Sequence, residues 1–237
     1  LGLFQNVTAV SGILIPLLAL VGALVGINRL NEAQKELEDA KNRLEQEMSE
    51  KRDELQRVRE DLEVSARLQR ENAAKTNLAL SLLPLGERQY RAQDYTGAIS
   101  TYRRALELDP DSVVTHYRLG YVYTQSGSLE EAQNHLTRAL EIEPDFGPAL
   151  ACLGYVNRRI GEKMPQGIER EQKLNYAESL LLEALAASPK LIDEDGEAWW
   201  GSLGGLYRRR GQINEAINAY AKAAEATPHS SYAHSNL

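Results

Sequence analysis

The stretch that decides the fold of this chain runs from Trp200 to Pro228 and reads WGSLGGLYRRRGQINEAINAYAKAAEATP. Apolar residues recur at helical spacing up to Tyr207, Gly211 interrupts the pattern, and a second helical pattern follows from Glu215. Pro228 then marks the end of the second helix, because proline cannot continue a helix. The stretch therefore predicts a hairpin of two helices.

Small and large residues alternate in this hairpin. Gly204, Ala216 and Ala223 let the two helices approach closely, while residues such as Trp200 and Tyr220 fill the space beside them. A single hairpin cannot bury its own apolar face. The pattern therefore predicts that neighbouring copies exist in the same chain.

Three further copies precede this stretch. The clearest copy matches it position for position at His116, Leu119, Gly120, Tyr123, Gly127, Ala132, Leu136, Ala139 and Pro144. An earlier copy closes at Pro110, 34 residues before Pro144, and a third runs from Leu150 to Pro189. The insertion Glu162–Tyr176 delays the second helix of the third copy, and a smaller insertion, Leu191–Gly196, precedes the fourth.

These residues and their period resemble the tetratricopeptide repeat family. The resemblance covers about Ala79 to the end and implies an all-α fold, with a superhelical array of four repeats over residues 76–237. Pro84 and Asn157 depart from the family pattern. A fifth copy begins at Ser231 and stops within its first helix, so we expect the native protein to continue beyond Leu237 or to end in an unusual capping helix.

The resemblance also implies a concave groove lined by the first helix of each repeat, in which the family holds extended peptides or partner helices. The family register places eight residues there, namely Tyr117, Arg118, Tyr121, Tyr155, Arg158, Arg159, Arg208 and Arg209. Arginine binds carboxylates with two parallel hydrogen bonds, so this set favours a protein or peptide partner that is acidic. The alternative is that these arginines pair with glutamates of neighbouring repeats and only solvate the surface.

One specialised role of the family is disfavoured. Some members clamp the acidic tail of heat-shock chaperones with basic and polar residues. Leu83, Pro84 and Glu87 stand where that pattern would begin. A chaperone adaptor role is therefore not expected.

The N-terminal residues 1–28 predict a transmembrane helix. No charged residue occurs from Val7 to Asn28, and Ala9–Ile27 is almost wholly apolar, which is close to the roughly 20 residues needed to cross a bilayer. A buried core helix and a signal peptide are the alternatives, although the segment before the run lacks the basic flank of a signal peptide. Basic residues follow the span, which places the repeats of a single-pass protein in the cytoplasm and favours a bacterial inner membrane over an organelle.

Small residues recur along one face of this segment at Ala19, Gly22, Ala23 and Gly26. Their spacing allows close backbone contact, so they are candidates for helix packing in the membrane.

Residues 29–75 predict a long charged helix, because they contain no glycine or proline. A heptad pattern places leucine, valine or methionine at Leu30, Leu37, Leu44, Met48, Leu55, Val58 and Leu62. Polar residues interrupt this seam at several positions. The segment is expected to form a coiled-coil-like stalk that joins a parallel homo-oligomer, and the alternative is a lone solvated helix.

The remaining features argue against catalysis and nucleic-acid binding. With a formal charge of −7, the chain is not expected to have the basic surface of a nucleic-acid binder. Its one cysteine, Cys152, excludes an internal disulfide. His116 occupies a packing position, and no histidine has the spacing of a metal or nucleophile site. We expect no enzyme activity, catalytic residue, cofactor or metal. Trp199 and Trp200 cannot both face the core, so one of them is expected to contact a partner or to pack on the preceding insertion. Repeat packing does not explain Trp199 and Arg208–Arg210, which are therefore the candidate partner contacts.

The sequence therefore predicts a non-enzymatic, membrane-anchored scaffold or adaptor that binds protein partners through its repeat groove. Two alternatives stay open. The chain could be a structural accessory subunit of a larger membrane protein complex, or an oligomerising membrane sensor or effector.

Overall fold

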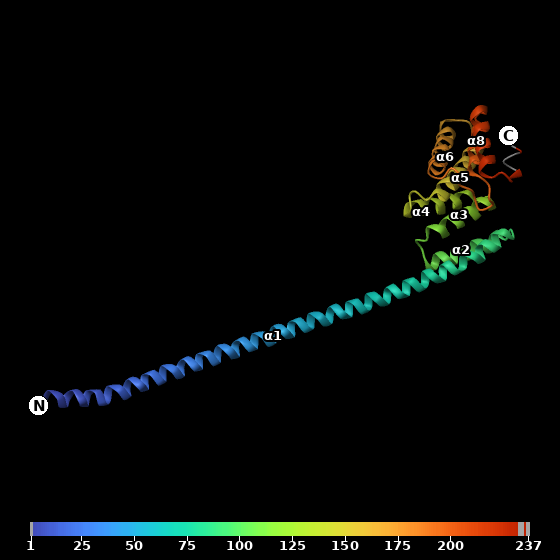
Figure 1. Cartoon of the computed structure of the whole chain (residues 1–237). Coiled ribbons are helices and arrows are strands. Elements are labelled where there is room, and N and C mark those ends of the chain that lie inside the picture. The colour runs from blue at the N-terminus through green and yellow to red at the C-terminus, as the bar shows by residue number, and fades with distance from the viewer. Residues whose placement is uncertain (1, 232–234, 236–237) are drawn as a thin grey trace. The chain divides into compact units, whose positions relative to one another are not determined.

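The computed structural model describes residues 2–231 and 235, with side chains from Pro16 onward; apart from Ser231 and Ser235, the expected fifth repeat lies outside these residues (Figure 1). The described residues are helical and form two units, Leu1–Arg70 and Glu71–Leu237. Helix α1 (Gly2–Arg91) contributes to both units. The all-α prediction is confirmed for the described part of the chain.

In the first unit, the apolar heptad positions of α1 are not covered by other described residues. The seven seam residues from Leu30 to Leu62 are each about half exposed or more. Pairs such as Lys51–Glu54 (2.6 Å) and Arg59–Glu63 (2.9 Å) link charges one turn apart, as in a solvated helix. The small-residue face is equally open, because a Cβ atom added at Gly22 or Gly26 would meet no atom within 4 Å.

No helix among the described residues is long and apolar enough to cross a membrane. The expected span is only partly described, because its residues 1–15 lie outside the described side chains.

The second unit is a stack of helix hairpins. The end of α1 pairs with α2 (Tyr95–Leu108), and α3 (Val113–Ser126) pairs with α4 (Leu129–Ile142). The next two hairpins are α5 (Gly147–Lys163) with α6 (Ile168–Ala187), and α7 (Trp199–Arg209) with α8 (Ile213–Ala226). Each second helix also contacts the first helix of the next hairpin. One core of buried residues runs from Ala98 on α2 to Leu203 on α7, and a smaller cluster joins Ala198 to Ala223 on α8.

Glycine sets the close approach of the helices within each hairpin, as the sequence pattern predicts. A Cβ atom at Gly154 would lie 2.8 Å from Leu181 Cγ and 3.0 Å from the Ala177 carbonyl oxygen. A Cβ atom at Gly204 would lie 2.7 Å from the Tyr220 ring. These positions admit no larger residue without a shift of the facing helix.

The insertion in the third repeat lengthens its helices. Residues 162 and 163 extend α5, and residues 168–176 form the first turns of α6. Pro165 lies in the short connection, where it prevents α5 from continuing. The second insertion, Leu191–Gly196, instead forms a non-helical loop between α6 and α7. This loop contacts α1 and α3.

Candidate functional site

The segment 188–198 between α6 and α7, here called the acidic loop, is a compact hairpin that its own polar groups hold. The carboxylate of Asp193 accepts hydrogen bonds from the backbone N–H groups of Asp195 (2.9 Å) and Glu197 (2.8 Å). Ile192 and Ala198 form an antiparallel bridge, and Gly196 adopts φ of 85°, a conformation that glycine accommodates readily. The loop therefore presents its acidic side chains in a defined arrangement.

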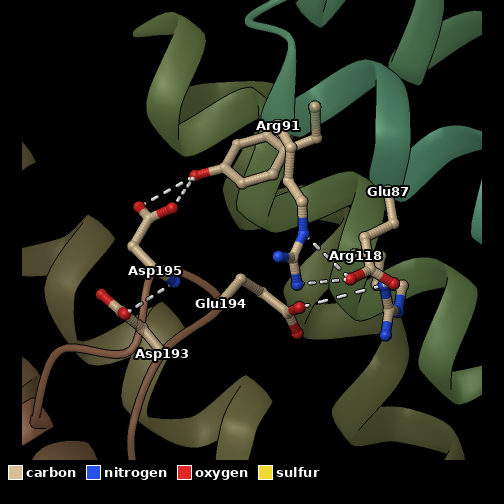
Figure 2. A network of polar contacts seen from close by, with 7 residues as sticks. Glu87, Arg91, Arg118, Asp193, Glu194 and Asp195 are labelled. Carbon is tan, nitrogen blue, oxygen red and sulfur yellow. Dashed lines mark hydrogen bonds and ion pairs between the residues drawn. The ribbon is translucent and has the colours of Figure 1, made fainter.

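Asp195 connects this loop to the first two repeats. The Tyr90 hydroxyl on α1 donates to Asp195 Oδ1 at 2.7 Å, and the Tyr121 hydroxyl on α3 donates to Oδ2 at 2.9 Å. Figure 2 shows the loop reaching the helices of the first repeats at this point. Burial raises the pKa of both tyrosines, and the nearby carboxylates raise it further, so both stay neutral donors.

Glu194 makes a second, charged link beside the first. Arg118 Nη1 on α3 lies 3.8 Å from Glu194 Oε2 and 3.3 Å from Glu87 Oε2 on α1 (Figure 2). Arg91 Nη2 contacts the other oxygen of Glu87 at 2.7 Å. The hydrogen bond from Arg91 and the charge of Arg118 hold the pKa of Glu87 below its usual value, although burial opposes them. The four side chains form an alternating charge network.

A cavity of about 380 Å³ lies where the acidic loop meets the first helices of the second to fourth repeats. Its walls include an aromatic set and an acidic set from several elements: Tyr121, Tyr155, Trp199, Asp193, Asp195 and Glu197. Gln125 and Ser202 add neutral polar groups, and none of the described residues that line the cavity is a lysine, arginine or histidine. Residues from α3, α5, α7 and the loop thus converge on one concave space.

Some of the predicted groove residues contact other residues of the chain, and others are exposed. Arg118 and Arg158 already have acidic partners, since Arg158 Nη1 lies 2.8 Å from Glu162 Oε1 one turn away. Arg159 donates to the Tyr155 hydroxyl at 3.0 Å. These three arginines therefore contact residues of the same chain, which was the alternative to partner binding.

The other predicted residues lie at the two ends of the set. Tyr117 is buried, with its ring edge-on to Phe146 at 5.7 Å, so it serves the core. Arg208 and Arg209 are exposed at the end of α7, and no ion pair within the described part of the chain involves them. Only this last pair offers open guanidinium groups.

The two tryptophans take separate roles, as their adjacency requires. Trp199 is 3 % exposed and lies edge-on to Tyr155, with ring centroids 6.1 Å apart. Trp200 Nε1 donates to the Pro189 carbonyl at 2.7 Å, and Lys222 Nζ lies 4.3 Å from the Trp200 ring centroid. Trp199 therefore belongs to the cavity, while Trp200 packs against the start of the loop and α8.

Arg210 is structural, unlike its exposed neighbours. Its guanidinium contacts Glu178 Oε2 at 2.6 Å and Asn175 Oδ1 at 2.6 Å, both on α6. It thereby ties the fourth repeat to the third. Of the candidate partner contacts Arg208–Arg210, Arg210 therefore makes its contacts within the chain.

His116, His135 and the cysteine serve packing in the described structure. His116 Nε2 donates to the Pro110 carbonyl at 3.0 Å, and its Nδ1 lies 3.1 Å from His135 Nδ1. Cys152 is fully buried near Thr124, and burial raises the pKa of its thiol to about 12. No group of three metal-binding side chains is placed to hold an ion among the described residues.

The acidic loop is the part of the site that sequence reasoning missed. The insertion Leu191–Gly196 was visible as extra length, but the run Asp193-Glu194-Asp195 was not linked to Tyr90, which lies 105 residues away. Its acidic composition, opposite a predicted set of tyrosines and arginines, was the available signal. Tyr90 itself lay outside the set that the family register supplied.

Comparison with known proteins agrees with this architecture. Tetratricopeptide repeat models match residues 89–153 and 200–230. The small glutamine-rich tetratricopeptide repeat-containing protein 2 of Mycosarcoma maydis is 28 % identical over 116 residues, covering 48 % of this chain and 33 % of that protein. The mitochondrial import receptor subunit TOM70 of Saccharomyces cerevisiae is 33 % identical over 88 residues, covering 37 % and 14 %. The chain spans a third or less of these relatives' length.

Solved structures share the fold. A structure of pilF from Pseudomonas aeruginosa aligns with a TM-score of 0.54 at 17 % identity, covering 69 % of this chain and 67 % of that one. A crystal structure of MamA aligns with a TM-score of 0.50 at 25 % identity, covering 69 % and 79 %. The family models thus identify tetratricopeptide repeats at residues 89–153 and 200–230, and the solved structures share the fold of the stacked hairpins.

Proposed function

We propose that this chain is a non-enzymatic scaffold whose protein partner binds the face formed by the first helices and the acidic loop, here called the inner face. Tetratricopeptide repeat proteins act as protein-interaction scaffolds, and the repeats make up most of the second unit. The observation that carries the proposal is the 380 Å³ cavity, because three repeats and the loop supply its walls. Sites of this size and mixed lining are typical of binding pockets.

Among the described residues, only one end of the inner face has arginines that are free to contact an acidic partner. Arg118 and Arg158 pair within the chain, so they are unavailable without breaking those contacts. Arg208 and Arg209 remain exposed on α7. We propose that an acidic part of the partner contacts these two residues.

Site-specific photo-crosslinking tests the location of the partner. A benzophenone amino acid at Gln125, which is exposed and lines the cavity, should capture the partner in cells that produce the protein. The same group at Ser100, exposed on α2, is the control and should capture much less. Equal capture at both positions would reject the inner face as the binding surface.

A second proposed function is self-association through the first unit. The seam residues from Leu30 to Leu62 are exposed along α1, and a parallel partner helix would bury them. Sedimentation of the whole chain, compared with a Leu37→Glu/Leu55→Glu variant, tests this proposal. A monomer for both chains would reject it and leave a lone stalk.

Membrane anchoring by residues 1–28 stays a prediction from the sequence. Large apolar side chains such as Leu18 and Leu20 are more than 60 % exposed, which favours burial in lipid or against another helix. Resistance of the protein to alkaline extraction from membranes tests the prediction. Mild-detergent purification then separates the alternatives, since stoichiometric integral-membrane partners favour an accessory subunit and a pure homo-oligomer favours a sensor or effector.

A further inference from the structure

We infer that the inner-face cavity is a receptor for a cationic side chain, lysine or arginine, that the protein partner supplies. The inference rests on the proposed function and specifies the chemistry of the bound residue. It differs from the acidic preference of the groove, which now concerns only Arg208 and Arg209 at the end of α7.

The first argument is charge without a counter-charge. Asp193, Asp195 and Glu197 line the cavity, and no ion pair among the described residues involves any of them. The groups that donate hydrogen bonds to them are neutral: backbone N–H groups, tyrosine hydroxyls and the hydroxyl of Ser230. Arg118, the nearest paired cation of the network, contacts Glu194. Three carboxylates thus converge with no ammonium or guanidinium among them.

The electrostatics of Asp193 agree with this arrangement. Burial raises its pKa, its two backbone hydrogen bonds lower it, and the neighbouring Asp195 raises it again. A bound cation would relieve both the burial and the like-charge repulsion of the carboxylate form. An acidic side chain entering the cavity would increase the repulsion.

The second argument is the aromatic wall. Tyr121, Tyr155 and Trp199 line the same cavity, and aromatic faces attract lysine and arginine side chains. Trp199 is 3 % exposed, and its indole Nε1 has no hydrogen-bond partner in the described structure. An ammonium or guanidinium has no acceptor for this N–H group, so Trp199 contributes to the site through its aromatic ring.

Tyr155 shows that this wall already holds guanidinium groups on one side. Arg158 lies 5.0 Å and Arg159 lies 5.6 Å from the centroid of the Tyr155 ring. Neither arginine lines the cavity, and Arg158 is neutralised by Glu162 at 2.8 Å. The other aromatic side chains that line the cavity are Tyr121 and Trp199, which are 2 % and 3 % exposed.

The probes are capped tripeptides, acetyl-Gly-Xaa-Gly-amide, in which Xaa is arginine, lysine, norleucine or glutamate. The full chain carries Trp200→Phe, which leaves Trp199 as the reporter of fluorescence, since the chain has two tryptophans. The arginine and lysine probes should change the Trp199 emission saturably at millimolar concentrations. The norleucine and glutamate probes should need at least ten times more. Equal responses, or tighter binding of glutamate, would overturn the inference.

Charge-neutralising variants locate the site. Asp195→Asn and Glu197→Gln should each weaken binding of the arginine probe about fivefold or more, while Asp145→Asn, an exposed acid outside the cavity, should leave it unchanged. Equal effects of all three would overturn the inference. Asp193 is left intact, because it holds the loop together.

A lysine introduced into the cavity wall shows whether weaker probe binding in a variant comes from unfolding or from the altered site. Ser202→Lys places an ammonium on the cavity wall, so it should raise the thermal midpoint and abolish binding of the arginine probe. Ser202→Glu should lower the midpoint. A lower midpoint for the lysine than for the glutamate variant would contradict the inference.

The outcomes separate the two proposals. Capture of the partner at Gln125 together with failure of the arginine probe would reject the cation receptor and keep the scaffold function. Binding of the arginine probe without capture at Gln125 would do the reverse.

Discussion

The hydroxyl of Tyr90 donates to the carboxylate of Asp195 across 105 residues of sequence, at 2.7 Å and 2.9 Å from its two oxygens. This contact joins the first repeat to the loop before the fourth. In a stack where each hairpin otherwise contacts its neighbours, it is a long-range closure of the array. Its stability contribution can therefore be measured separately.

Tyr90→Phe and Asp195→Asn are each expected to lower the free energy of unfolding by about 1–3 kcal/mol, because a hydrogen bond to a charged group is lost. Tyr121 retains its bond to Asp195 in the first variant, so the loss should lie near the lower end. Urea unfolding of both single variants and the double variant gives the coupling energy. A coupling near zero would show that the contact does not close the array.

Gly154→Ala is expected to destabilise the array by about 1–3 kcal/mol, because the added Cβ would lie 3.0 Å from the Ala177 carbonyl oxygen. The backbone of α6 cannot yield as a flexible side chain would. Gly22→Ala is the matched control, since its Cβ meets nothing within 4 Å. Thermal unfolding of the repeats should be unchanged by the control, and equal losses would contradict the close approach.

The array should lose stability as pH falls from about 6.5 towards 4. Burial lowers the pKa of His135 to about 4, and the charges of His116 and Arg103 lower it further. The neutral ring is thus preferred in the folded state, and its stability contribution is complete above the unfolded pKa of about 6.5. Acidification should then cost on the order of 2–3 kcal/mol, at about 1.4 kcal/mol per pKa unit.

The geometry explains why the neutral form of the neighbouring His116 is also preferred. The carbonyl of Pro110 can only accept, so His116 Nε2 carries the hydrogen and His116 Nδ1 accepts from His135. Protonation of His116 would set two N–H groups against each other. Urea unfolding across this pH range should show a shallower slope for His135→Phe and an unchanged slope for His229→Phe, which alters an exposed histidine.

Arg210→Ala and Arg209→Ala change adjacent arginines with different surroundings. Arg210 is 14 % exposed and bonds to Glu178 and Asn175, so its loss should cost about 1–3 kcal/mol. Arg209 is exposed, and its loss should cost about 0.5 kcal/mol or less. Denaturant unfolding of the two variants checks the order, and a larger loss for Arg209 would contradict the assignment.

Arg208→Glu/Arg209→Glu should reduce capture of the partner through Gln125 at least fivefold without altering the thermal midpoint. The reason is that both side chains are exposed and lack ion pairs among the described residues. Arg103→Glu/Arg104→Glu, an exposed pair on α2, is the control. Unchanged capture by the first variant would reject the acidic contact.

The repeats were predictable because their spacing carries the packing information. Gly120, Gly154 and Gly204 recur at the same place in the pattern, and each lies against a large side chain of the facing helix. Local periodicity is sufficient to identify such contacts, since they form between adjacent helices. The helical extension at residues 168–176 was read as an insertion because it breaks the family period, although its residues suit a helix.

The site was less predictable, because its key contacts are non-local. The family register identified Tyr121 and Tyr155, which do line the cavity. It also assigned Arg118 to partner binding, but Arg118 pairs with Glu87 and Glu194 of the same chain. No periodic pattern links residues 90 and 195. An irregular loop takes its position from side-chain contacts that only the folded structure reveals.

Hydrogen–deuterium exchange tests the central claim most directly. Exchange is measured for the whole chain alone and with the partner that capture through Gln125 identifies, here bound without a cross-link. If the partner binds the inner face and fills the cavity, exchange should slow in residues 191–202 and around Gln125, while Ser100 and its neighbours on α2 stay unchanged. Protection confined to residues 2–70, with no change at the acidic loop, would contradict the claim.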